Sequence, residues 1–263
     1  MNPSTQDIWI PTPAGRLFAR LWSAAKPQAN ADTPIVLLHD SLGCIELWRD
    51  FPALLAQASG RTVIAYDRLG FGRSDAHPGL LPQSFIRDEA GASFAAVCDA
   101  LGLDRFVLFG HSVGGGMAVA CAARWVQRCR ALITESAQAF VEGRTLQGIR
   151  DAQQSFAQDP QLLRLRKYHG DKAPWVLSAW IDTWQAPGFA SWNLDEDLRR
   201  VTCPVLVLHG VLDEYGSVLH PQRIAELVAG PSRSVVLDGC GHVPHREMTD
   251  VVLATVTGWL AAV

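Results

Sequence analysis

A serine between two glycines is the first feature of this sequence that could do chemistry. Ser112 is the centre of a Gly-x-Ser-x-Gly pattern, with Gly110 before it and Gly114 after it. An apolar stretch typical of a strand precedes the pattern, and a segment that suits a helix follows at once. At such a sharp turn the serine backbone is strained, and the residues two positions to either side must lack a side chain. The pattern predicts that Ser112 is a nucleophile.

A serine nucleophile needs a base to remove its proton and a third group to orient that base. Asp213 and His242 lie downstream, and each follows an apolar stretch typical of a buried strand. Loops that follow parallel strands gather at one edge of a sheet. We therefore expect Asp213 as the acid and His242 as the base to meet Ser112 at that edge.

The predicted elements that position these loops alternate between strands and helices. After an opening hairpin, apolar stretches predict strands at about 35–38, 62–66, 106–110, 131–134, 205–208 and 234–237. Segments that suit helices lie near 48–57, 82–101, 114–125, 220–229 and 247–262. The alternation predicts an α/β fold with a mostly parallel, doubly wound sheet and helices on both faces.

The order of these segments resembles the α/β-hydrolase family over nearly the whole chain. The stretch that ends at His39 is similar to the family's strand ending in His-Gly, and residues 67–74 are similar to its Asp-x-x-Gly-x-Gly-x-Ser loop. The resemblance implies a triad of Ser112, Asp213 and His242. Some members of the fold carry the acid after an earlier strand, which makes Glu135 the alternative.

The same resemblance implies an oxyanion hole built from two backbone N–H groups. One belongs to Val113, which follows the nucleophile, and the other to Ser41. The register remains open among Asp40, Ser41 and Leu42. Asp40 stands where the family most often has glycine, and we expect its side chain to point away from the developing oxyanion.

A break in the alternation predicts an insertion, because about 70 residues separate two successive strands where one crossover helix would suffice. The family often carries a cap domain at this place. We therefore expect a core domain formed by 1–135 and 200–263, with an inserted helical cap at 136–199.

A tryptophan-rich stripe inside the expected cap is the candidate substrate surface. Its residues follow helical spacing and share one apolar face: Leu177, Trp180, Ile181 and Trp184. The stripe either fastens the cap to the core or lines an acyl pocket through Trp180 and Trp184. Trp48 and Phe140 are further candidates for the pocket.

Four other histidines are interpreted as structural. His39 and His209 end predicted strands and should satisfy backbone groups, while His111 should point away from the nucleophile, because adjacent strand residues face opposite sides. His245 is expected to lie beyond the loop that carries the base.

Composition excludes several classes of partner and cofactor. A net charge of −3 without a run of basic residues argues against binding to nucleic acid. The sequence has no stretch of 18 consecutive apolar residues, so no membrane span is predicted. The N-terminus has no signal-peptide pattern, so we expect a cytoplasmic protein. The six cysteines lack ligand spacing, so no metal is predicted, and the expected reaction needs no organic cofactor. The oligomeric state stays open.

These residues predict an enzyme that forms an acyl-enzyme intermediate. Our interpretation is a serine hydrolase that cleaves a small to medium, largely apolar carboxylic ester or lactone. The alternatives are a carbon-carbon bond hydrolase of ring-cleavage dienones, an amide hydrolase and a cofactor-free oxygenase. A ligand-binding receptor without turnover is disfavoured, because all three triad residues are present.

Overall fold

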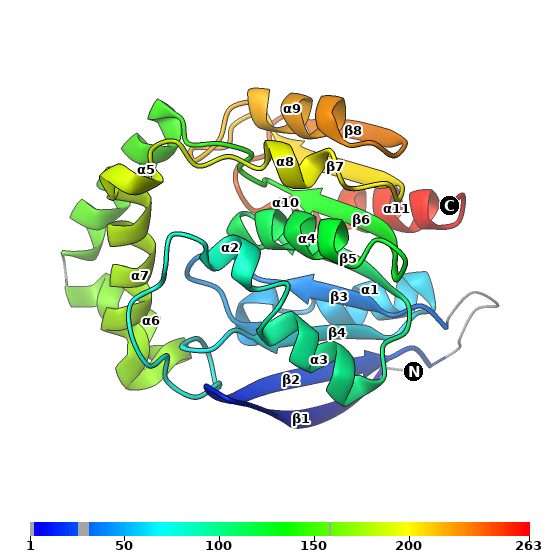
Figure 1. Cartoon of the computed structure of the whole chain (residues 1–263), viewed down its shortest axis with the longest axis horizontal. Coiled ribbons are helices and arrows are strands. Elements are labelled where there is room, and N and C mark those ends of the chain that lie inside the picture. The colour runs from blue at the N-terminus through cyan, green and yellow to red at the C-terminus, as the bar shows by residue number, and fades with distance from the viewer. Residues whose placement is uncertain (1–2, 26–31, 158) are drawn as a thin grey trace.

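An eight-stranded sheet forms the centre of the computed structural model, which describes residues 3–25, 32–157 and 159–263 (Figure 1). The strands are β1 (Ser4–Thr12), β2 (Gly15–Ser23), β3 (Ile35–Leu38), β4 (Val63–Asp67), β5 (Phe106–His111), β6 (Cys129–Glu135), β7 (Val205–Gly210) and β8 (Ser232–Leu237). Their order is β1-β2-β4-β3-β5-β6-β7-β8. The β1-β2 hairpin joins β4 in antiparallel fashion and the remaining pairs are parallel. The predicted fold class is confirmed.

Helices cover both faces of the sheet (Figure 1). On one face, α1 (Phe51–Ser59) and α11 (Thr249–Leu260) pack against each other and against the sheet. The other face is covered by α2 (Phe85–Asp88), α3 (Ser93–Leu101), α4 (Val113–Arg124), α8 (Asp195–Leu198) and α9 (Leu219–Leu227). The central strands are buried from both sides, which explains their unbroken apolar sequence.

The helix expected over 82–101 is instead two helices, α2 and α3. Ala92 adopts φ −109° and ψ −94°, outside the helical region, and the Phe94 amide bonds the carbonyl of Glu89. The buried Glu89 carboxylate also accepts a hydrogen bond from the Tyr66 hydroxyl at 2.6 Å. The apolar periodicity continues across this break, so it could not reveal the break.

Three helices of the inserted segment lie beside the carboxyl edge of the parallel strands (Figure 1). They are α5 (Gly143–Phe156), α6 (Asp159–His169) and α7 (Ala173–Gln185), which contact one another. The end of the segment differs, because α8 packs on α4 and Leu198 is fully buried in the main core. The last part of 136–199 therefore packs with the core rather than with these helices.

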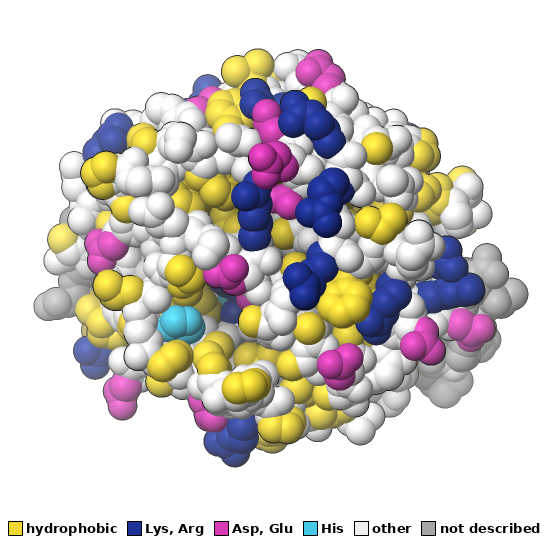
Figure 2. Space-filling view, in the orientation of Figure 1, with side chains coloured by type: hydrophobic (Ala, Val, Ile, Leu, Met, Phe, Trp, Pro, Cys, Tyr) yellow, Lys and Arg dark blue, Asp and Glu magenta, His cyan; other side chains and the backbone are white. Residues whose placement is uncertain are grey.

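The face shown in Figure 2 carries acidic and basic side chains close together. Arg87 pairs with Asp197 at 2.6 Å, and Arg223 pairs with Asp195 at 2.7 Å. This face therefore presents no broad field of one sign. No helix in the described part of the chain is long and apolar enough to cross a membrane.

Candidate active site

Ser112 occupies a strained turn between β5 and α4. Its φ of 55° and ψ of −126° lie in a region that residues with a Cβ rarely adopt. A Cβ at Gly110 would lie 2.2 Å from the carbonyl oxygen of Gly114, and one at Gly114 would lie 2.2 Å from that of Leu38. Both glycines are therefore required by close backbone contacts, as the motif predicted.

The two glycines that follow the motif differ in their surroundings. A Cβ at Gly115 would lie 2.4 Å from the Cβ of Ala137, which leaves no room for a side chain. At Gly116 the nearest atom, from Ile86, is 3.4 Å away, an ordinary contact. Close packing below the turn thus depends on Gly115 and not on Gly116.

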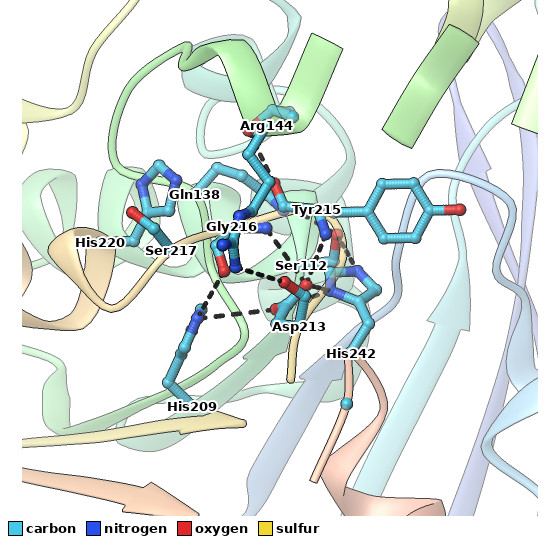
Figure 3. A network of polar contacts seen from close by, with 12 residues as sticks. Ser112, Gln138, Arg144, His209, Asp213, Tyr215, Gly216, Ser217, His220 and His242 are labelled. Atoms are coloured by element: carbon cyan, nitrogen blue, oxygen red, sulfur yellow. Dashed lines mark hydrogen bonds and ion pairs between the residues drawn. The ribbon is translucent and has the colours of Figure 1, made fainter. Parts of the chain in front are cut away.

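The structure brings Ser112, His242 and Asp213 together at the carboxyl edge of the sheet (Figure 3). The Nε2 atom of His242 lies 3.0 Å from the Ser112 hydroxyl, and its Nδ1 atom lies 2.8 and 2.9 Å from the Asp213 carboxylate oxygens. The backbone amides of Tyr215 and Gly216 also donate to Asp213 Oδ1. A hydroxyl, an imidazole and an oriented carboxylate are thus linked in the order that nucleophilic catalysis requires.

Asp213 is fully buried but remains suited to carry a negative charge. Burial alone would raise its pKa, but the hydrogen bond and charge of His242 outweigh burial and lower the pKa. His209 lies 3.8 Å from this carboxylate and donates to the Gly216 carbonyl, and burial lowers the pKa of His209. His209 therefore supports the Asp213 loop as a neutral residue.

Glu135, the alternative acid, pairs with a different histidine. Its Oε2 atom lies 2.5 Å from Nδ1 of His245, and both side chains are buried. His111 is close to both, and the ligand atoms of the three residues lie within 4.8 Å of one another. The contact between Glu135 and His245 already occupies the Nδ1 atom of His245.

The two predicted oxyanion donors, Val113 and Ser41, lie close to each other. Val113 begins α4, where the amides of a first helical turn have no partner within the helix. Ser41 and Val113 line one narrow recess beside the nucleophile. The Leu42 amide already donates to Asp40 Oδ1 at 3.1 Å, which favours Ser41 over Leu42 in the open register.

A cavity of about 130 Å³ opens beside the nucleophile. Its walls come from the sheet edge and from α5 and α7, and they combine polar and apolar side chains: Asp40, Ser41, Leu42, Ser112, Gln138, Thr145, Ile149, Trp180, Trp184, Tyr215 and His242. Trp180 and Trp184 thus lie where a substrate pocket was expected.

Trp48 and Phe140 do not line this cavity, which corrects the expectation for both. Trp48 is buried on the other side of His111, and its ring lies 4.6 Å from that of His245. The Phe140 ring lies 4.4 Å from that of His220, with Arg223 stacked over it. Both aromatic side chains pack under loops, a role that residue type alone does not distinguish from pocket lining.

Two residues beside the triad were missed by the sequence interpretation, as were Thr145 and Ile149 in the cavity wall. Gln138 follows β6, and its Oε1 atom lies 3.4 Å from the Ser112 hydroxyl. Tyr215 follows the acid by two residues, and its ring lies 4.8 Å from that of His242. Their positions in loops after β6 and β7 were a usable signal, because those loops meet at the carboxyl edge.

Replacing Trp180 with alanine should change substrate preference more than stability. Trp180 is half-buried and lines the cavity, whereas Trp184 is anchored by Phe189 and Trp192 at ring distances of 5.3 and 5.6 Å. We expect Trp180→Ala to shift the ratio of kcat/KM between bulky and short esters by about tenfold to a hundredfold. Trp184→Ala should also lower the free energy of unfolding by about 3–5 kcal/mol.

Ester kinetics and thermal unfolding of both variants measure these effects. Trp175→Ala serves as a control, because Trp175 also lies on α7 but packs on Phe71 and His77 outside the cavity. An unchanged ester preference in Trp180→Ala and Trp184→Ala would mean that the stripe is purely structural.

Comparison with known proteins agrees with the fold. Residues 33–173, over half of the chain, match the family described as alpha/beta hydrolase fold. The chain therefore belongs to the α/β-hydrolase family.

Two relatives match nearly the full length. A 2-hydroxy-6-oxo-2,4-heptadienoate hydrolase of Pseudomonas putida is 28% identical, with 89% of this chain and 91% of the relative covered. A 2-hydroxymuconate semialdehyde hydrolase of a Pseudomonas species is also 28% identical, with 89% and 88% covered. The solved structure of an enol-lactonase from Burkholderia xenovorans has a TM-score of 0.73 and 21% identity, with 97% of this chain and 100% of that chain covered. At that identity the structural likeness concerns the fold alone.

Proposed function

We propose that this protein is a serine hydrolase that cleaves a small, neutral and largely apolar carboxylic ester or lactone. Ser112 is the nucleophile, His242 the general base and Asp213 the residue that orients it. The observation that carries the proposal is the continuous set of contacts from the Ser112 hydroxyl through His242 to Asp213.

In the proposed mechanism, His242 takes the hydroxyl proton as Ser112 attacks the carbonyl carbon. Backbone N–H groups of Val113 and Ser41 receive the oxyanion, and Asp213 stabilises the charged imidazole. His242 then gives the proton to the leaving alcohol, and an acyl-enzyme remains. Water activated by His242 releases the acid and restores the serine.

The cavity walls support a neutral substrate. Among the described residues that line the cavity, none is Lys or Arg, and Asp40 is the one carboxylate. Arg68 reaches only the adjoining recess, where its Nη2 donates to the Asp40 carbonyl at 2.8 Å. A volume of about 130 Å³ lies below the range of roughly 300–1,000 Å³ that is typical of ligand pockets, so a short acyl group fits best.

Carbon-carbon bond hydrolysis is the second candidate, because the two long relatives are hydrolases of a heptadienoate and of a muconate semialdehyde. The same three residues could serve that reaction. A carboxylate on such a substrate would have to enter a cavity that carries Asp40. Amide hydrolysis and cofactor-free oxygenation have no specific support from the cavity.

The residues around the site also support a proposal about the inserted segment. We propose that α5, α6 and α7 of the segment 136–199 act as a cap over the core, with α5 and α7 as the walls that face the substrate and α8 packed with the core. Location in the cytoplasm and an apolar acyl compound as the small-molecule substrate stay predictions.

A pair of esters that differ only in charge tests the proposed substrate. p-Nitrophenyl butyrate should be cleaved with a kcat/KM at least about tenfold higher than mono-p-nitrophenyl glutarate, because the second carboxylate would lose water without a Lys or Arg in the lining to pair with it. The carbon-carbon reaction is tested in parallel, by chromatography of the products that form from a heptadienoate substrate. Faster cleavage of that substrate than of any ester would assign the carbon-carbon reaction instead.

A further inference from the structure

His111, which is buried, and Asp40, whose side chain is 31% exposed at the cavity, form a polar pair behind the candidate triad. The Nδ1 atom of His111 lies 3.5 Å from Asp40 Oδ2, and His111 is only 2% exposed. Asp40 replaces the glycine of the family pattern that the sequence resembles. The pair therefore occupies a position where this chain departs from its family.

The same pair touches both halves of the catalytic machinery. Nε2 of His111 donates to the backbone carbonyl of His242 at 2.8 Å, and the two rings lie 5.1 Å apart. Asp40 Oδ1 accepts the Leu42 amide at 3.1 Å, in the loop that carries the Ser41 amide. One short chain of contacts thus joins the base to the loop of the oxyanion donor.

The two contacts of His111 favour its charged form. Nε2–H donates to the His242 carbonyl, and Nδ1 faces an ionised carboxylate oxygen at 3.5 Å, which is an ion-pair distance. A neutral imidazole has a single N–H group and would turn a lone pair toward Asp40, whereas the imidazolium form presents an N–H group on both sides. The positive charge of His111 then offsets the negative charge of Asp40, which lies next to the site of the developing oxyanion.

The groups that face His111 come from several elements. Asp40 follows β3 and Glu135 ends β6, while His242 lies in the loop after β8 and His245 in the short helix α10 (Pro244–Glu247). Burial by itself would lower the pKa of His111, but the bond to Asp40 and the charge of Glu135 outweigh it and raise the pKa to about 9. Burial would likewise raise the pKa of Asp40, and the bond to His111 keeps it below its ordinary value.

We propose that Asp40, at the cavity wall, and the buried His111 form an ion pair that positions the His242 main chain and the 40–42 loop for catalysis. Both are positioning residues, since neither moves a proton in the reaction. The inference rests on the proposed function only for its activity readout.

The sign of the pH dependence follows from the direction of the shift. A raised pKa in the folded protein means that the pair stabilises fully below the unfolded value of about 6.5. This contribution is lost as the pH rises toward about 9. We therefore expect kcat to fall near that pH with little change in KM, because geometry rather than binding is lost.

The variant Asp40→Asn removes the charge of the side chain and keeps its size and shape. Its amide N–H can donate to a neutral His111 Nδ1, while His111 Nε2–H still bonds the His242 carbonyl. The variant should lower the pKa of His111 to about 6.5 or below and remove the alkaline fall in kcat. Asp40→Ala also loses the contact to the Leu42 amide, and its kcat should drop by about tenfold to a hundredfold.

Imidazole NMR titration of full-length protein measures the pKa of His111, with its signal assigned by its absence in His111→Asn. The rate at which a fluorophosphonate labels Ser112 reports activation of the serine without an ester substrate. Asp99→Asn, an exposed carboxylate on α3, is the control that should change neither readout.

Three results would overturn the pair: a wild-type His111 that titrates at or below about 6.5, a value unchanged in Asp40→Asn, or equal labelling rates in wild type and Asp40→Ala. Absence of ester turnover with a normal NMR titration and normal labelling would count against the proposed substrate instead, and would leave the ion pair supported.

Discussion

Replacing Ser112 with alanine should reduce turnover by about four to six orders of magnitude while the fold is retained. The change removes the nucleophilic oxygen that lies 3.0 Å from His242 Nε2. The strained backbone at φ 55° is no worse for alanine than for serine, so little stability should be lost. Steady-state kinetics on a p-nitrophenyl ester, with circular dichroism of the same samples, measure both effects.

Ser136→Ala is a matched control for this experiment. Ser136 is also a fully buried serine at positive φ, and within the described residues its hydroxyl has no hydrogen-bond partner. It does not line the catalytic cavity. Its variant should keep kcat within about tenfold of wild type. Comparable activity in folded Ser112→Ala and Ser136→Ala would remove Ser112 from the role of nucleophile.

Asp213→Asn should lower kcat by about four orders of magnitude, somewhat less than the loss of the nucleophile. The amides of Tyr215 and Gly216 both donate to Oδ1, so they should hold the new amide oxygen at that position. The amide nitrogen then occupies the Oδ2 position, 2.9 Å from His242 Nδ1. Where it donates to Nδ1, the ring proton moves to Nε2 and no acceptor is left for the serine proton; the oxygen at the Oδ1 position, 2.8 Å from Nδ1, favours the opposite tautomer but no longer carries the charge that stabilises the imidazolium.

Glu135→Gln distinguishes the two candidate acids. Its carboxylate bonds His245 rather than His242, so the variant should cost much less turnover than Asp213→Asn. Parallel kcat measurements on the two purified variants show which carboxylate is the acid of the triad. If Glu135→Gln is the more damaging change, the acid has been misassigned.

The pH dependence of Asp213 has the opposite sign to that of His111. The pKa of Asp213 is lowered in the folded protein, so its stabilising effect is present above the unfolded value and is lost at acid pH. The pKa of His111 is raised, so its effect is lost at alkaline pH. Stability and activity should therefore both be greatest between these limits.

The sequence by itself determined the strands, the turn at Ser112 and the order of the triad residues. Each of these depends on local constraints. Close backbone contacts in one turn leave room only for glycine at positions 110 and 114, and apolar runs are typical of strands buried on both faces. Such constraints act over a few residues, so they are visible in a linear pattern. They could not locate the break between α2 and α3, because apolar periodicity continues across it.

Only the tertiary structure decided which side chains meet at the site. Ser112 and His242 are 130 residues apart, and Gln138 and Tyr215 join them from two further loops. Trp180 faces the cavity while Trp48 packs behind it, although both are large apolar residues suited to either place. The pairing of Asp40 with His111 likewise depends on the adjacency of β3 and β5 in the sheet. Side-chain neighbours that are distant along the chain are set by packing, and residue type alone leaves several such neighbours possible.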